Sequence, residues 1–126
     1  MSSPDLTLQE VFAIEIAAAL PGVESGAHPP KDGPLPYIQF GQSEVGDNFV
    51  PGHELFFDVH VWSNAEGPHE VKNFQSAIRL AIHDRSYERN GWRFTCVREH
   101  NARTILDVDD ETWHGVQRFR ALAGLL

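Results

Sequence analysis

Histidines are the residues of this chain whose ordinary pKa best suits acid–base chemistry near neutral pH, and they are also common metal ligands. None of the histidines forms the His-Glu-x-x-His or Cys/His spacing of a zinc site. The seven histidines lie at positions 28, 53, 60, 69, 83, 100 and 114. His60 and His114 fall in segments that read as strands, where they could meet across a sheet with Asp58 on the same face. A metal or acid–base site is one interpretation, and neutral, hydrogen-bonded histidines on a half-exposed face are the other.

Two further features suggest chemistry only weakly. Cys96 is the one cysteine, so the chain can form no internal disulfide, and this cysteine usage suits a reducing compartment. It lies within an apolar strand pattern, so we expect it to pack rather than to act as a nucleophile. The acidic stretch 107–111 has the composition of a calcium loop, but it lacks the glycine and the distant glutamate of that motif. We expect a solvated turn there.

The chain also lacks the glycine-rich and nucleophile motifs of common enzymes. No Gly-x-Gly-x-x-Gly, Walker loop or Gly-x-Ser-x-Gly elbow occurs. Nucleotide binding and serine hydrolysis are therefore not supported, and no motif indicates a cofactor.

The net charge disfavours binding to phosphates or to anionic lipid. Ten basic residues against eighteen acidic ones leave a formal charge of −8. The late arginines alternate with acids, which favours cross-strand ion pairs on a solvated sheet. They lie at 93, 98, 103, 118 and 120. The N-terminus does not resemble a signal peptide and no segment approaches the length of a membrane span, so we expect a soluble protein.

A strand and a helix between Glu54 and Asp84 define the core. Residues 54–62 alternate with a period of two, which places Leu55, Phe57, Val59 and Val61 on one face. The other face then carries Phe56, Asp58, His60 and Trp62. The following helix has an apolar stripe between Val71 and Ile82. Its far side is expected to carry Lys72, Gln75, Ser76, Arg79 and His83.

A first helix is predicted from Thr7 to about Leu20. Thr7 and Glu10 form a capping-box pattern, and Pro21-Gly22 ends the helix. Glu15 falls on its apolar arc, where it either reaches water at the edge of the stripe or pairs with an arginine of this chain or a neighbouring one. Segments 23–35 and 43–53 read as loops and 87–91 as a turn. The remaining strands are predicted at 36–41, 92–99, 103–106 and 113–122.

These elements predict one α+β domain over residues 1–126. We expect an antiparallel or mixed sheet of four to five strands, with two helices packed on one face. No internal repeat or linker indicates a second domain.

The succession of elements resembles the phage tail-completion, or tail-terminator, family, whose members also occur in gene transfer agents. The resemblance covers nearly the whole chain, from the first helix to Leu122, and it depends on the order of the pieces because none is a strict signature. The matching pieces are 35–41, 57–63, 77–82, 92–97, the acidic turn and 116–121.

The resemblance implies a structural protein without catalysis. Such a protein assembles as a ring, usually of six chains, on the end of a long non-contractile tail, and it joins the tail tube to the head connector. The expected partners are other copies of the chain, the tail tube protein and the connector or stopper protein. DNA would only pass through the lumen, past an acidic lining that repels its phosphates. Such a protein is made in the cytoplasm of the bacterial host and resides in the virion tail, at the head–tail junction.

A ring needs two different contact patches on each chain. Candidate interface residues are Phe49, Val50, Phe56, Trp62, Leu80 and Glu15. Two alternatives remain open at this point. One is a small-ligand-binding protein or enzyme with a site near His60 and His114, and the other is a regulatory module that pairs as a two-fold dimer.

Overall fold

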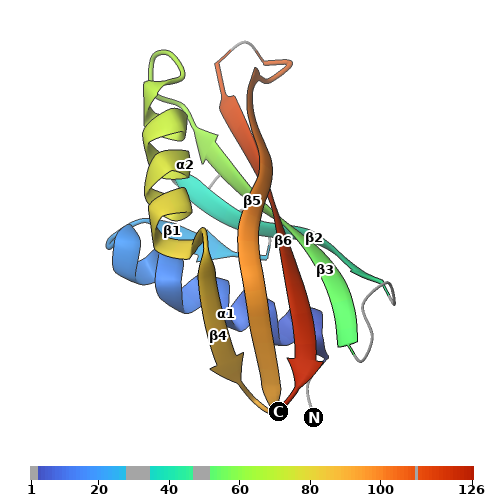
Figure 1. Ribbon diagram of the computed structural model, residues 1–126. Helices are drawn as coiled ribbons and strands as arrows, with labels where there is room; N and C mark the ends of the chain where they lie inside the picture. The colour runs from blue at the N-terminus through green and yellow to red at the C-terminus, as the bar shows by residue number, and fades with distance from the viewer. Residues whose placement is uncertain (1–2, 28–34, 47–51, 110) are drawn as a thin grey trace.

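The chain forms two helices and six strands in a computed structural model, which describes residues 3–27, 35–46, 52–109 and 111–126 (Figure 1). Within these ranges, neither helix has the length and apolarity needed to cross a lipid bilayer. In chain order the elements are α1 (Pro4–Ala19), β1 (Glu24–Gly26), β2 (Tyr37–Gly46), β3 (Gly52–Ser63), α2 (His69–Ile82), β4 (Arg85–Arg89), β5 (Trp92–Leu106) and β6 (Trp113–Leu125).

The six strands form one mixed sheet in the order β1-β2-β3-β6-β5-β4. The short β1 runs parallel to β2, and every other pair is antiparallel. The α+β class is confirmed, but the prediction of four to five strands is wrong. The expected loop 23–35 contains β1, and β4 occupies residues at the expected turn 87–91. Both strands are short, and in β4 only Tyr87 is even partly buried, so neither produces an alternating apolar pattern.

Strand β5 is continuous where two strands, 92–99 and 103–106, were expected. The register to β6 shifts between Thr95 and Arg98 and again between Glu99 and Asn101, so two β-bulges take up the irregular sequence. Cys96 lies in the first bulge with a φ of 54°. The bulge turns its side chain outward, and Cys96 is exposed rather than packed as predicted.

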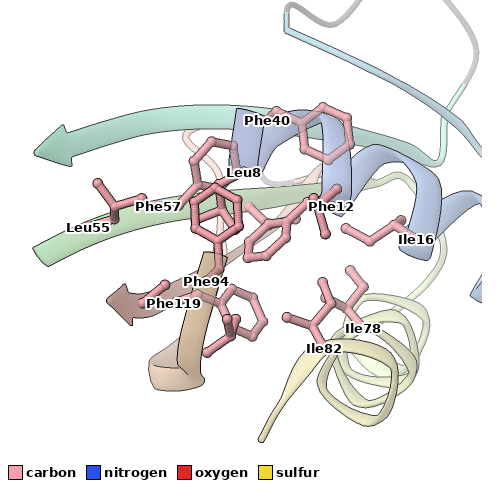
Figure 2. Close-up of a cluster of buried hydrophobic side chains, with 14 of the residues drawn as sticks. Leu8, Phe12, Ile16, Phe40, Leu55, Phe57, Ile78, Ile82, Phe94 and Phe119 are labelled. Atoms are coloured by element: carbon pink, nitrogen blue, oxygen red, sulfur yellow. The ribbon is translucent and has the colours of Figure 1, made fainter. Parts of the chain in front are cut away.

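Both helices bury their apolar stripes against the same face of the sheet. Phe12 of α1 is fully buried and makes edge-to-face contacts with Phe57 of β3 and Phe119 of β6, at centroid distances of 5.1 and 5.3 Å. Figure 2 shows these rings beside Ile78 and Ile82 of α2. The prediction that alternate residues of β3 point into the core is confirmed, because Leu55, Phe57, Val59 and Val61 are all buried.

The start of α1 differs from the predicted capping box. The helix begins at Pro4, a residue suited to the first helical position because its missing amide hydrogen would have no helical partner there. Thr7 is fully buried inside the helix, and its amide donates to the carbonyl of Ser3 at 3.1 Å. Its hydroxyl therefore cannot cap the helix. The predicted end is confirmed, since α1 stops at Ala19 and Gly22 follows with a φ of 86°.

Candidate functional site

The face of the sheet opposite the helices carries a group of polar and aromatic side chains that contact one another. We call it the open face. The alternation of β3 that buries Leu55 and Phe57 places the intervening residues here, and β6 and β5 add their own alternate residues according to the strand register. Its central residues are Phe56, Asp58, His60, Trp62, Arg103, His114, Val116, Arg118 and Arg120.

A pair of histidines beside a tryptophan forms the centre of the open face. His60 Nδ1 lies 2.7 Å from His114 Nε2, so the two rings share one hydrogen bond. Their planes differ by 18° while their centroids are 5.0 Å apart, which is the arrangement of rings joined edge to edge. Trp62 stacks on His114 at 3.7 Å with an angle of 6°, and its Nε1 donates to Gln39 Oε1 at 3.0 Å. The predicted meeting of His60 and His114 is confirmed.

Strand register and one glycine explain why this cluster forms. His114 lies opposite Trp62 in the β3–β6 ladder, and Gln39 of β2 lies opposite His60. Side chains of directly opposed residues contact each other on one face of an antiparallel pair. Gly41 provides the remaining space, because a Cβ atom there would overlap the His60 ring. Any larger residue at this position would displace the imidazole.

Burial keeps both imidazoles neutral near physiological pH. The pKa of His114 is lowered to about 4, chiefly by desolvation and next by the neighbouring His60, while Asp107 raises it and Arg103 lowers it. Burial also lowers the pKa of His60, against the opposing effect of Asp58. A neutral pair fits the short contact, because one nitrogen must donate a hydrogen and the other must accept it.

Asp58 is engaged in a charge pair rather than free for proton transfer. Its Oδ1 lies 3.3 Å from Arg118 Nη1, and Arg118 Nη2 lies 3.2 Å from Glu44. The Arg118 guanidinium also lies over the Phe56 ring, at 4.7 Å from its centroid. Beside it, Arg120 Nε donates to Glu54 at 2.7 Å. The predicted cross-strand ion pairing on this sheet is confirmed.

The open face is hollowed above this cluster, over about 600 Å³. His60, His114, Trp62 and Arg103 line the hollow, together with residues of β2. Both imidazoles and the carboxylate have partners within the cluster, so the arrangement orients side chains and leaves no poised acid–base pair among them. Among the residues described, no three His, Cys, Asp or Glu side chains lie close enough together to hold a metal ion.

The predicted interface residues lie on three different surfaces. Phe56 and Trp62 are partly buried on the open face, where each already contacts a neighbouring ring. Leu80 is 75% exposed on the outer side of α2. Glu15 lies partly buried at the edge of the α1 stripe and lines a small cavity with Tyr87, whose pKa is raised to about 12, chiefly by burial. Phe49 and Val50 lie outside the described residues.

A polar network beneath α2 was missed by the sequence reasoning. Gln75 was expected on the polar far side of the helix, but it is only 5% exposed and faces the sheet. Gln117 Nε2 donates to the Gln75 carbonyl at 2.8 Å and to Glu99 at 2.7 Å, and Glu99 pairs with Arg79 at 3.0 Å. The signal that could have indicated it is Gly115, where a Cβ would meet Gln75 and Val71 at 2.6 and 2.5 Å. The helix approaches β6 closely there.

Asp109 of the acidic turn accepts its hydrogen bonds from within the turn. Asp109 accepts hydrogen bonds from the Glu111 amide at 2.9 Å and from the Thr112 amide and hydroxyl at 2.8 and 2.6 Å. These bonds lower the pKa of Asp109. Val108 is 97% exposed at the tip, which confirms the predicted solvated turn.

Two comparisons with known proteins show the fold and the family of this chain. The fold is shared with a chain from a structure described as the virion of a native gene transfer agent particle, with a TM-score of 0.78 and 21% identity over 97% of this chain and 98% of the other. The architecture is thus one found among the proteins of a virion. A family model described as tail completion protein gp17 matches residues 14–124, and the chain belongs to that family of structural proteins of the phage tail. No curated protein matches the chain.

Proposed function

We propose that the protein is a tail terminator, which closes the end of the tail tube as a ring and joins the tail to the head connector. The particle would be a long-tailed, non-contractile phage or a gene transfer agent, and the ring would contain six chains at the head–tail junction. The observation that carries this proposal is the family match over residues 14–124. The virion chain with the same fold supports it, because that chain matches over nearly its full length.

The distribution of charge suits a ring around a DNA channel. The acids at one end of the molecule have no ion-pair partner among the described residues, in contrast to the paired acids of the open face. These acids are Glu66, Glu70, Asp107, Asp109 and Glu111. They lie in the loop before α2, in the first turn of α2 and in the β5–β6 connection, at the top of Figure 1. Carboxylates there would repel phosphates, so that a duplex would slide past without binding.

Exposed apolar side chains on different elements suit contacts with more than one partner. Leu80 projects from α2, while Val108 projects from the β5–β6 turn, and both are large apolar side chains left in water. A ring of identical chains uses two different patches on each chain, and docking on a tube and a connector uses further ones. We propose Leu80 and the cluster of Phe56 and Trp62 as contact residues, with Glu15, Phe49 and Val50 as further candidates.

The test uses particles whose gene for this protein has been deleted. We expect separate heads and tails, with tails of irregular length because tube growth is no longer stopped. Adding the purified protein to these tails should cap one end of each tube, visible in electron micrographs, and restore joining to heads. Normal, joined tails in the deletion strain would contradict the proposal, and so would added protein that never binds a tube end.

A further inference from the structure

Among the residues that the structure describes, two strand edges of the sheet have no neighbouring strand over much of their length. Strand β1 pairs only with Tyr37–Gln39, which leaves 41–46 of β2 without a partner on that side. Strand β4 pairs only within 92–97, which leaves 98–106 of β5 without one. These statements concern the ranges 35–46 and 52–109, which the structure describes. We call these segments the β2 edge (41–46) and the β5 edge (98–106).

The backbone of the β5 edge is oriented for pairing. Gln75 Nε2 donates to the Arg103 carbonyl at 3.1 Å, so this carbonyl points away from β6. In an antiparallel ladder the amide and carbonyl of one residue point to the same side, and the direction alternates along the strand. The amides of Asn101, Arg103 and Ile105 therefore face outward, where an added strand could accept their hydrogens. Two other backbone groups of this edge are already bonded within the chain, because Gln75 occupies the Arg103 carbonyl and the Glu99 amide donates to His83 Nδ1 at 3.0 Å.

The side chains of the two edges are complementary in charge. Glu44 lies on the β2 edge with its side chain 69% exposed, opposite Phe56 and thus on the open face. Arg103 lies on the β5 edge, opposite Val116 and also on the open face. No described carboxylate lies within ion-pair distance of Arg103. An added strand on the β5 edge could thus place a carboxylate beside it.

The region behind the β5 edge is also basic and partly open. Lys72 and Arg79 of α2 line a groove of about 410 Å³ together with Ala102 and Thr104. Arg79 is already paired with Glu99, so the cations of the groove without an ion-pair partner among the described residues are Lys72 and Arg103, which suit an acidic or neutral segment. The β2 edge meets that requirement, because its residues 41–46 include one charge, that of Glu44, and an apolar Val45 that is 46% exposed.

The two edges overlap in part and are otherwise staggered across the sheet. Through the ladders, Ser43 of the β2 edge is level with Glu99, and Gly46 at its end is level with Thr95. The β5 edge begins at Arg98 and extends toward the other end of the molecule, up to Leu106. A sheet that closes around an axis needs such a stagger between its joined edges, because its strands must tilt.

We propose that the β2 edge of one chain pairs with the β5 edge of the next copy in the ring, with Glu44 facing the neighbour's Arg103. This inference rests on the proposed ring. The contact is heterologous, since it uses two different segments of each chain, and it therefore repeats around an axis. Backbone pairing supplies the attraction, and the ion pair on the open face sets the alignment of the two strands.

The test compares Glu44→Arg, Arg103→Glu and the double variant that carries both changes. Each single variant places two like charges at the contact, and we expect the concentration for half-maximal ring formation on purified tail tubes to rise at least tenfold. The double variant restores opposite charges and should return to within about threefold of the unmodified chain. Light scattering and micrographs of capped tubes measure both effects. Within each chain, Arg118 still forms its ion pair with Asp58 when Glu44 is replaced.

Arg93→Glu is the matched control, because it reverses a charge on the part of β5 that β4 already covers. It should assemble like the unmodified chain. Ile105→Pro is a second, backbone-directed variant that removes one outward amide without removing a bond to β6. It should weaken ring formation while the circular dichroism spectrum stays unchanged.

Single variants that cap tubes as well as the unmodified chain would overturn the edge pairing, while the terminator function would stand. A double variant as weak as the single ones would overturn the alignment of Glu44 with Arg103. An unmodified chain that never forms rings or caps tubes would overturn the proposed function and the pairing together.

Discussion

The hydrogen bond between His60 and His114 predicts that stability falls as the pH drops below neutrality. The pKa of His114 is about 4 in the folded chain and 6.5 in its ordinary range, so the unfolded chain binds more protons between these values. A base with a depressed pKa contributes its full stabilisation above about pH 6.5 and loses it as the pH falls toward 4. The lowered pKa of His60 acts in the same direction.

The size of the effect follows from the pKa difference and from exposure. The interval between 4 and 6.5 corresponds to about 3.4 kcal/mol in the free energy of unfolding. The pair is only partly buried, and water screens it, so we expect a loss of about 1–2 kcal/mol. The charged groups that act on the pair are Asp58 of β3, Arg103 of β5 and Asp107 in the turn after β5.

Urea unfolding between pH 4.5 and 7.5 measures this loss, and proton NMR of the imidazoles measures the two pKa values directly. In the His114→Phe variant the ring can still stack on Trp62 but cannot take up a proton. We expect its free energy of unfolding to fall by about 1 kcal/mol less over the same interval. His69→Gln removes an imidazole at the start of α2 and leaves the pair in place, so it should keep the steeper fall.

Two results would refute this reasoning. One is an imidazole of His114 that titrates near 6.5 in the folded protein, because the pair would then not be neutral in the way its geometry implies. The other is an equal pH dependence in the His114→Phe variant and the unmodified chain.

Three further changes follow from the packing. Phe12→Ala should lower the free energy of unfolding by about 3–5 kcal/mol in urea titrations, because it leaves a cavity between two sheet phenylalanines, and a loss below about 1 kcal/mol would contradict the described core. Gly115→Ala should cost about 1–3 kcal/mol, since its methyl group would press on Val71 and Gln75, and an unchanged melting temperature would argue against the close approach of α2. Leu80→Asp should alter the free energy of unfolding by no more than about 0.5 kcal/mol while weakening tube capping, and unimpaired capping would remove Leu80 from the proposed contacts.

Sequence reasoning predicted the parts of the fold whose pattern is repeated over many residues. The alternation in β3 predicted that strand and its buried face, and the apolar stripe predicted α2. The strand pattern also predicted that His60 of β3 meets His114 of β6. Sequence reasoning did not predict the elements whose formation depends on tertiary contacts. The strand β4 has no apolar pattern, because its single inward residue is Tyr87, and the bulges of β5 depend on pairing with β6.

The candidate site was predictable only in its central residues. Gln75 looks polar and peripheral on a helical wheel, yet it is buried because it bonds to the sheet backbone at Arg103. Strand edges are likewise invisible to periodicity, since they depend on where β1 and β4 end. The sequence predicted that arginines would pair with acids across the sheet, but which residues pair depends on the register between β3 and β6.

The outward bulge of β5 gives the particle a natural place for a reporter group. Cys96 is the chain's one thiol, and it is exposed, so a maleimide dye or spin label would attach once per chain. It lies in the bulge at the end of the part of β5 that pairs with β4, just before the segment proposed to join the next copy. In a closed ring the labels would form a regular polygon. The ratio of the next-nearest to the nearest distance between labels depends on the number of corners, so measuring it would give the number of subunits on an intact tail.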